Sequence, residues 1–275
     1  MSRPPGIHVT AMGAVTPVGL TAAASCAALR AGISNKQEIG NFAVAEEQFD
    51  EQPAVGGRVP LEWLAGEPAP ELWPGHERWE AAEPPPLDSI IESGTRRLEL
   101  LIPPAIADLM ADPGWPAHLP EDTGLYLGID EEDDPEEVAG VVKAAVGVSF
   151  CQVQIVAKGR AAGLAALVTA RKDLIAGSVR AAIVGGIDSR IRPEALSRWK
   201  LAGILRSATN NHGIIPGEGA GFVLLEPSDQ VAGRKGVPKA TVSGAGLAVE
   251  PTDGTDEPNR AEGLTRAVRS AVQQA

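Results

Sequence analysis

Few side chains of this sequence are suited to nucleophilic or acid–base chemistry. The chain has two cysteines, Cys26 and Cys151, and four histidines. A reactive thiol is expected at a helix start or beside a cation, where its pKa falls. Cys26 lies in a stretch of small residues and Cys151 is not at a helix start, so we expect both to be buried structural thiols. We expect His8, on an alternating strand, and His212, in an Asn-Asn-His-Gly turn, to be structural as well.

The densest charged segment is acidic and spans residues 130–137, where seven carboxylates surround Pro135. Clustered carboxylates can bind a hard cation, but neither a spaced ligand set nor a glycine at a sharp turn accompanies them here. We therefore expect a solvated loop that caps the N-terminus of a helix at 135–146. We expect no metal and no cofactor.

Residues 158–186 form the stretch that the rest of the chain must position. Their pattern predicts a tight turn, a helix of small residues and then an apolar strand that ends at Gly185-Gly186. Gly177 follows the last helical position, where a residue free to adopt positive φ commonly ends a helix. Residues 181–184 are all apolar, which predicts a central strand covered on both faces. One side of the helix carries Leu164, Leu167, Ala170, Leu174 and Ile175.

This stretch resembles the nucleophile segment of the β-ketoacyl-acyl carrier protein synthases, a family with the thiolase fold. In that family a pattern close to T-A-C-x-S-G-L begins a buried helix, which leads into a strand that ends in Gly-Gly. Counting back from Gly185-Gly186 places Gly163-Leu164 on the family's Gly-Leu and Arg160 on its nucleophilic cysteine. The resemblance therefore implies the family's scaffold with no catalytic residue at the nucleophile position.

Other motifs extend the resemblance over nearly the whole chain, but only over the first half of a full-length synthase. The most specific is Gly217–Gly221 followed by Phe222–Glu226, which is similar to the family's G-E-G-A-x-x-L-V-L-E. Thr16–Gly19 and Leu29–Gly32 resemble the family's opening turn and the end of its first helix. The two histidines and the lysine that the second half supplies in the family have no matching motif here.

The resemblance implies an α/β protein with a mixed central sheet, helices on both faces, and one half of the duplicated thiolase-like architecture. We expect residues 1–275 to form one ketosynthase N-terminal-like domain. Within it, the prolines and tryptophans at about 35–87 predict an irregular excursion with short helical turns near 61–65 and 72–78. Residues 88–110 show a helical pattern, in which the successive prolines at 103 and 104 predict a break.

The candidate pocket consists of Arg160, Gly163, Asp188 and Glu218. Arginine keeps its proton and offers only donors, so Arg160 cannot act as a nucleophile. A cation at a helix N-terminus is unfavourable unless an acid pairs with it, and Asp188 and Glu218 lie in motifs that close on this region in the family. We expect Arg160 to pair with one of them. We also expect a bulky side chain at Gly163 to destabilise the protein, because the helix start leaves no room for it.

Composition limits the classes of partner. The formal net charge of −12 and the sequence pI of about 4.9 argue against nucleic acid and anionic membranes. No apolar run approaches the ~20 residues that span a bilayer, and the first residues show no secretion signal, so we expect a cytoplasmic protein. The charge also disfavours long-range attraction of an acidic acyl carrier protein.

Three functions remain open. The first is a catalytically silent ketosynthase-like protein that works by binding, as a scaffold or adaptor. It would be similar to a chain-length factor or to the degenerate thiolase-like proteins encoded among bacterial secretion-effector genes. The second is a β-ketoacyl synthase-type acyltransferase of fatty acid or polyketide synthesis that acts with a second subunit. The third is a fragment without a function of its own.

A half-length thiolase-like fold has a physical consequence for its partners. The helix of residues 161–176 would leave one face uncovered, and soluble monomers rarely expose a large apolar patch. We therefore expect a homo-oligomer or an obligate protein partner. The candidate partners are a second ketosynthase-like subunit, an effector protein and an acyl carrier protein.

Overall fold

The computed structural model describes residues 5–46, 49–60, 94–207, 210–252 and 257–275. Its helices are α1 (Ala22–Arg30), α4 (Gly94–Ala111), α5 (Pro135–Val146), α6 (Ala162–Ala176), α7 (Pro193–Leu201), α8 (Ser228–Gly233) and α9 (Glu262–Gln274). Its strands are β1 (Ile7–Val15), β2 (Gln37–Glu46), β3 (Phe49–Gly56), β4 (Thr123–Ile129), β5 (Gln152–Ala157), β6 (Ala181–Ser189), β7 (Glu218–Pro227) and β8 (Ala240–Val242). A one-turn 3-10 helix, η2 (Gly159–Ala161), directly precedes α6.

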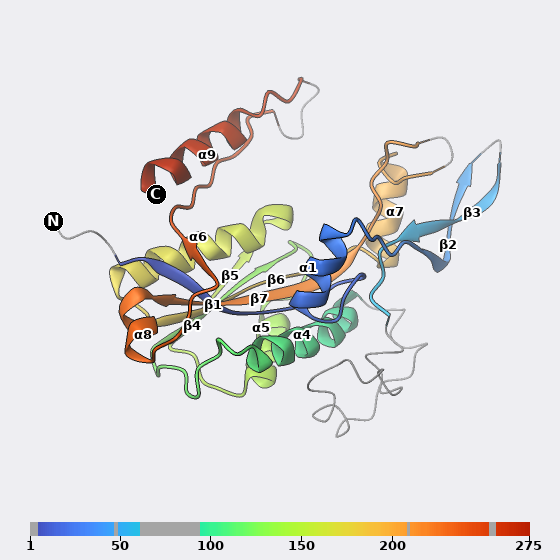
Figure 1. Cartoon of the computed structure of the whole chain (residues 1–275). Coiled ribbons are helices and arrows are strands. Elements are labelled where there is room, and N and C mark those ends of the chain that lie inside the picture. Colours follow the sequence, from blue (N-terminus) through green and yellow to red (C-terminus); the bar gives the residue numbers. More distant parts are fainter. Residues whose placement is uncertain (1–4, 47–48, 61–93, 208–209, 253–256) are drawn as a thin grey trace.

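Six strands form one mixed sheet in the order β5-β4-β6-β7-β1-β8. Strands β5, β4 and β6 are parallel, whereas β7 is antiparallel to both β6 and β1, and β8 is antiparallel to β1. Helices α4 and α5 cover one face of the sheet, and α6 covers the other (Figure 1). The predicted α/β architecture, with a mixed sheet and helices on both faces, is therefore confirmed.

Two apolar clusters join the sheet to its helices. The larger lies on the side of α4 and α5, and the smaller lies on the side of α6. Along β4, Leu125 and Leu127 belong to the larger cluster, and Tyr126 between them belongs to the smaller. All three are fully buried, because both faces of the strand are covered.

Helix α6 packs against the sheet through its small residues. Ala162, Ala166 and Ala170 lie on its buried side, so the helix approaches the strands closely. Gly177 ends the helix with a φ of +73°, as its position predicts. Leu164, which the sequence pattern grouped with the buried Leu174, is instead 67% exposed.

Two local predictions differ from the structure. Helix α4 continues through Pro103 and Pro104 without a break, and the flanking residues Ile102 and Ala105 are fully buried, so packing holds the helix together where two backbone donors are missing. Strands β2 and β3 form an antiparallel hairpin within the segment predicted to be irregular. The helical turns predicted near 61–65 and 72–78 lie outside the described residues.

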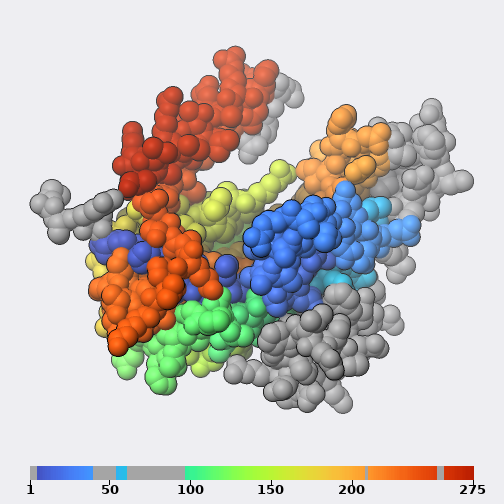
Figure 2. Space-filling view, viewed as in Figure 1, coloured from blue at the N-terminus to red at the C-terminus, as the bar shows by residue number. Residues whose placement is uncertain are grey.

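Helix α9 stands off from the sheet on the side of α6 (Figures 1 and 2). The chain between β8 and α9 runs back along this helix. Gly244 and Gly246 allow the close approach, since a Cβ at either would overlap a carbonyl oxygen of α9. None of the helices in the described part of the chain is long and apolar enough to cross a membrane.

Candidate functional site

The start of α6 is where the sequence predicts the site. Arg160 lies in η2, the turn that precedes the helix, and its side chain is exposed. It lines two adjoining hollows, one of about 360 Å³ over the sheet and one of about 480 Å³ toward α7. The described residues that line these hollows include no cysteine, serine, threonine or histidine. At the start of α6, the structure thus places an exposed guanidinium that has no ion-pair partner among the described residues.

Backbone atoms bring the start of α6 onto the sheet. A Cβ added to Gly128 of β4 would lie 2.5 Å from the Cα of Gly163 and closer still to its nitrogen. A Cβ added to Gly163 would lie 3.5 Å from the Cα of Gly186, which is an ordinary contact. A methyl group at Gly163 would therefore fit, and the predicted cost of a bulky side chain there stays a prediction. The position without room is the strand glycine, Gly128.

Glu218 is buried and already paired. Its carboxylate forms an ion pair with Arg97 of α4, whose Nε donates to Oε2 at 2.6 Å. It also accepts hydrogen bonds from the hydroxyl of Ser189 at 2.9 Å and from the backbone nitrogen of Val59 at 2.8 Å. Glu218 therefore joins β7 to α4, β6 and the chain after β3, which is a structural role.

Asp188 is also paired with an arginine other than Arg160. The Nε of Arg190 donates to its Oδ2 at 2.9 Å, and Arg190 also pairs with Asp130. Burial raises the pKa of Asp188, while Arg190 opposes this rise. In the described part of the chain, Arg160 forms no hydrogen bond or ion pair. The predicted pairing of Arg160 with Asp188 or Glu218 is therefore wrong, because Arg190 and Arg97 hold these acids.

The acidic loop after β4 is only partly solvated. Asp130 and Asp133 are buried, and Arg192 pairs with them at 3.3 Å and 2.8 Å. Asp134 caps α5, because its side chain accepts hydrogen bonds from two backbone nitrogens of the first turn. The predicted cap is confirmed, whereas the prediction of a fully solvated loop is wrong for the two buried acids.

The sequence analysis missed the two arginines that neutralise this loop. Arg190 and Arg192 follow β6, and the acids at 130–133 follow β4. These two strands are parallel neighbours, so their carboxyl ends lie at the same edge of the sheet. A signal was therefore present in the sequence, because opposite charges directly follow two apolar strands.

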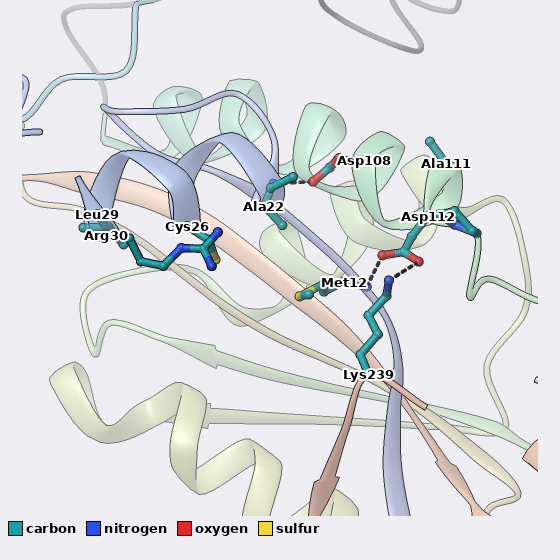
Figure 3. Close-up of a pocket in the computed structure, with 11 residues that line it drawn as sticks. Met12, Ala22, Cys26, Leu29, Arg30, Asp108, Ala111, Asp112 and Lys239 are labelled. Carbon is teal, nitrogen blue, oxygen red and sulfur yellow. Dashed lines mark hydrogen bonds and ion pairs between the residues drawn. The ribbon is translucent and has the colours of Figure 1, made fainter. Parts of the chain in front are cut away.

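Neither thiol replaces the missing nucleophile. Cys151 precedes β5 and Arg160 follows it, so a strand of six residues, roughly 20 Å long, lies between them. Cys26 lies on α1 and lines a separate hollow of about 810 Å³ (Figure 3). Both cysteines are exposed, so the prediction of buried thiols is wrong. In α1 only one side of the helix is covered, and Cys26 is on the other.

The two aspartates that line this separate hollow accept hydrogen bonds from the backbone of strand β1. Strand β8 pairs only with Ile7–Val9 of β1. Beyond that point, the backbone nitrogen of Met12 donates to Asp112 at 3.2 Å (Figure 3). The backbone nitrogen of Ala14 donates to Asp108 at 3.0 Å. Asp108 also accepts from the first backbone nitrogen of α1 at 2.7 Å. Both acids thus replace a missing strand partner.

The two histidines singled out in the sequence have different surroundings. The Nε2 of His8 contacts the hydroxyl of Ser228 at 2.9 Å, and its Nδ1 contacts the hydroxyl of Thr241 at 3.0 Å. The Ser228 hydroxyl donates to the carbonyl of Gly6 at 3.0 Å. His8 therefore links β1, α8 and β8, as expected of a structural residue. His212 is exposed in the loop before β7, away from the start of α6.

Comparisons with known proteins agree with this geometry. Residues 135–230 match the family described as Beta-ketoacyl synthase, N-terminal domain. None of the curated proteins compared with the chain matches it. The ketosynthase from module 6 of the bacillaene synthase of Bacillus subtilis 168 is 16% identical and superposes with a TM-score of 0.70, over 98% of this chain and 48% of that chain.

Two other solved structures cover more of their own length. The ishigamide ketosynthase/chain length factor is 21% identical, and a β-ketoacyl synthase from Burkholderia phymatum STM815 is 18% identical. Both superpose with a TM-score of 0.70 over 98% of this chain and 70% of theirs. By comparison, the chain spans only about half the length of the bacillaene ketosynthase.

The matched residues 135–230 include the start of α6 with Arg160 and the buried Glu218 of β7. At these identities the structural similarity establishes the fold, and the sequence match identifies the segment. The chain therefore has the thiolase fold of these ketosynthases, and its residues 135–230 are similar to the N-terminal domain of β-ketoacyl synthases.

Proposed function

We propose that this protein is a catalytically silent ketosynthase-like protein that works by binding another protein, as a scaffold or adaptor. The observation that carries the proposal is the start of α6, where an exposed Arg160 stands in place of a nucleophile. Acyl transfer through a covalent intermediate needs a thiolate that can hold the acyl group. The guanidinium stays protonated and cannot form a thioester, and both thiols lie elsewhere.

Exposed apolar side chains support a protein partner. On α9, Leu264, Val268 and Val272 are 65%, 53% and 69% exposed, and their spacing of four residues places them on one face. Leu164 of α6 is also exposed, and together with α9 it lines a hollow of about 500 Å³. Apolar patches of this kind mark interaction sites on soluble proteins. A second ketosynthase-like subunit, as in a chain-length-factor pair, or an effector protein would cover this surface.

The distribution of charge does not oppose an acidic partner at the start of α6. Residues 46–92 contain twelve acidic and two basic residues, so most of the net charge of −12 lies there. The hollow toward α7 is lined by four cations, at 158, 160, 190 and 198, and by the three acids at 130–132. Of these cations, Lys158 and Arg160 have no ion-pair partner within the described ranges. The overall charge therefore says little about which protein docks at this hollow.

An acyl-transfer measurement tests the proposal. The purified protein is incubated with an acyl-acyl carrier protein and a malonyl-acyl carrier protein, next to an active ketosynthase as the positive control. Intact-mass spectrometry should show no acyl adduct, and no condensation product should form. An adduct that disappears in Cys26→Ser or Cys151→Ser would overturn the proposal.

The alternative function is a β-ketoacyl synthase-type acyltransferase that acts with a second subunit in fatty acid or polyketide synthesis. It predicts acyl transfer only when that subunit is present. A pull-down of the tagged protein from its native cell, with mass spectrometry, names the candidate subunit, and the acyl-transfer measurement is then repeated with both proteins. Turnover that depends on a thiol of this chain would establish the alternative, whereas turnover that survives Cys26→Ser/Cys151→Ser would leave this chain as the silent partner.

A further inference from the structure

The hollow between α1 and α4 has the size and the lining of a small-molecule site. Its volume is about 810 Å³, and its lining is mainly apolar, with Met12, Leu29 and Ala111 among its residues. Sites for small molecules are typically apolar hollows of about 300–1,000 Å³ with a few polar groups. Figure 3 shows α1 on one side, the end of α4 on the other, and Met12 of β1 between them. None of these lining residues lines the hollows at the start of α6.

Four charged side chains line this hollow, and two of them neutralise each other. The Nζ of Lys239 lies 3.0 Å from Oδ1 of Asp112 (Figure 3). The same oxygen accepts from the backbone nitrogen of Gly114 at 2.8 Å, and Oδ2 accepts from that of Met12. The pair of Lys239 and Asp112 therefore leaves no net charge for an occupant to match.

Asp108 and Arg30 are the two charged groups that remain. Both hydrogen bonds that Asp108 accepts reach Oδ2, and no described residue donates to Oδ1 or forms an ion pair with this carboxylate. Burial raises the pKa of Asp108, a cost that a bound cation would offset. Arg30 ends α1 and has neither a hydrogen bond nor an ion pair with the described part of the chain. A carboxylate from α4 and a guanidinium from α1 thus line the hollow without an ion-pair partner.

Strand β1 adds a hydrogen-bond acceptor between these two charges. The backbone N–H groups of Met12 and Ala14 point away from β7, since they donate to the aspartates of α4. In an antiparallel strand, the C=O group of a residue points to the same side as its N–H. Among the described residues, no group outside the β1–β7 ladder donates to the carbonyl oxygen of Met12. The hollow therefore offers a free strand edge, to which the N–H of a peptide can bind.

We infer that this hollow binds a short apolar peptide with free termini. Its ammonium group pairs with Oδ1 of Asp108, and its carboxylate pairs with Arg30, whose planar donors suit a carboxylate. An N–H of the peptide donates to the carbonyl of Met12, and the apolar side chains contact the apolar lining. A ligand with a single charge would leave either Asp108 or Arg30 unmatched, whereas a zwitterion matches both.

The thiol of Cys26 reports whether the hollow is occupied. Cys26 lines it and is exposed, whereas Cys151 is equally exposed but lies outside it, before β5. The unmodified protein is alkylated with iodoacetamide, and the rate at each cysteine is measured by mass spectrometry of its peptides. Leucyl-leucine at about ten times its dissociation constant should slow the alkylation of Cys26 about tenfold. The rate at Cys151, the internal control, should not change.

Capped peptides and two variants test the two charged contacts. The amide of leucyl-leucine has no carboxylate and N-acetyl-leucyl-leucine has no ammonium group, so each should bind about tenfold more weakly. Arg30→Gln, at an exposed position, should weaken leucyl-leucine by a similar factor but leave the amide unaffected. Asp108→Asn, which keeps an acceptor for the two backbone nitrogens, should weaken leucyl-leucine but not the acetylated peptide. Free leucine, which has no peptide N–H, should bind more weakly than leucyl-leucine.

Three results would overturn the inference. They are an unchanged rate at Cys26, equal slowing at both cysteines, and equal binding of leucyl-leucine and its capped forms. Free leucine that binds as tightly as leucyl-leucine would also contradict the assigned peptide contact with Met12. None of these measurements involves acyl transfer or a second protein, so the inference and the proposed function can fail separately.

Discussion

Gly128, where strand β4 contacts the start of α6, should tolerate no side chain. A methyl group at Gly128 would lie 2.5 Å from the Cα of Gly163, about 1 Å inside ordinary carbon–carbon contact. The obstacle is the backbone of a helix whose start also lies against Gly186, so it cannot swing aside like a side chain. Overpacking a core lowers the free energy of unfolding by about 1–3 kcal/mol, occasionally more. We expect Gly128→Ala to lower the free energy of unfolding by about 3 kcal/mol.

Gly163→Ala is the matched control, because it adds a methyl group on the helix side of the same contact. A methyl group at Gly163 would meet only ordinary contacts, and replacing a helical glycine gains about 0.5–1 kcal/mol. Urea unfolding at 25 °C, followed by circular dichroism, should therefore shift the two midpoints in opposite directions. If Gly128→Ala unfolds within about 0.5 kcal/mol of the unmodified protein, or Gly163→Ala loses as much as Gly128→Ala, the reasoning from this backbone contact is refuted.

Two further predictions concern buried polar groups, both measured by urea unfolding. Asp108 accepts two backbone N–H groups through one oxygen, so Asp108→Ala should cost about 2–4 kcal/mol, whereas Asp108→Asn keeps an acceptor. Burial raises the pKa of Asp108, so the unmodified protein loses stability as pH rises from the ordinary aspartate pKa of about 4 toward the raised one. The free energy of unfolding of Asp108→Asn relative to the unmodified protein should therefore increase as pH rises above about 4. A constant difference would contradict this assignment. Arg97→Ala leaves the charge of Glu218 buried and unpaired and should cost about 3–5 kcal/mol, whereas Arg180→Ala, which breaks an exposed and solvent-screened pair, should leave the free energy of unfolding close to that of the unmodified protein. Similar losses in both variants would refute the argument from burial.

Local signals in the sequence predicted the elements that depend on neighbouring residues. Asp134 caps α5, and Gly177 ends α6 in the left-handed region, both as their positions indicate. In each case the chemistry is confined to one turn of helix, so sequence neighbours are also spatial neighbours.

The arrangement of charges at the site could not be predicted in the same way. Glu218 pairs with Arg97, which is 121 positions away in the sequence. Asp188 pairs with Arg190, only two positions away, because the chain leaves β6 toward the acids that follow β4. The sequence offered Arg160 as the nearest cation by motif, but the choice among arginines depends on strand order. Ion-pair partners are thus set by topology, which composition and spacing do not specify.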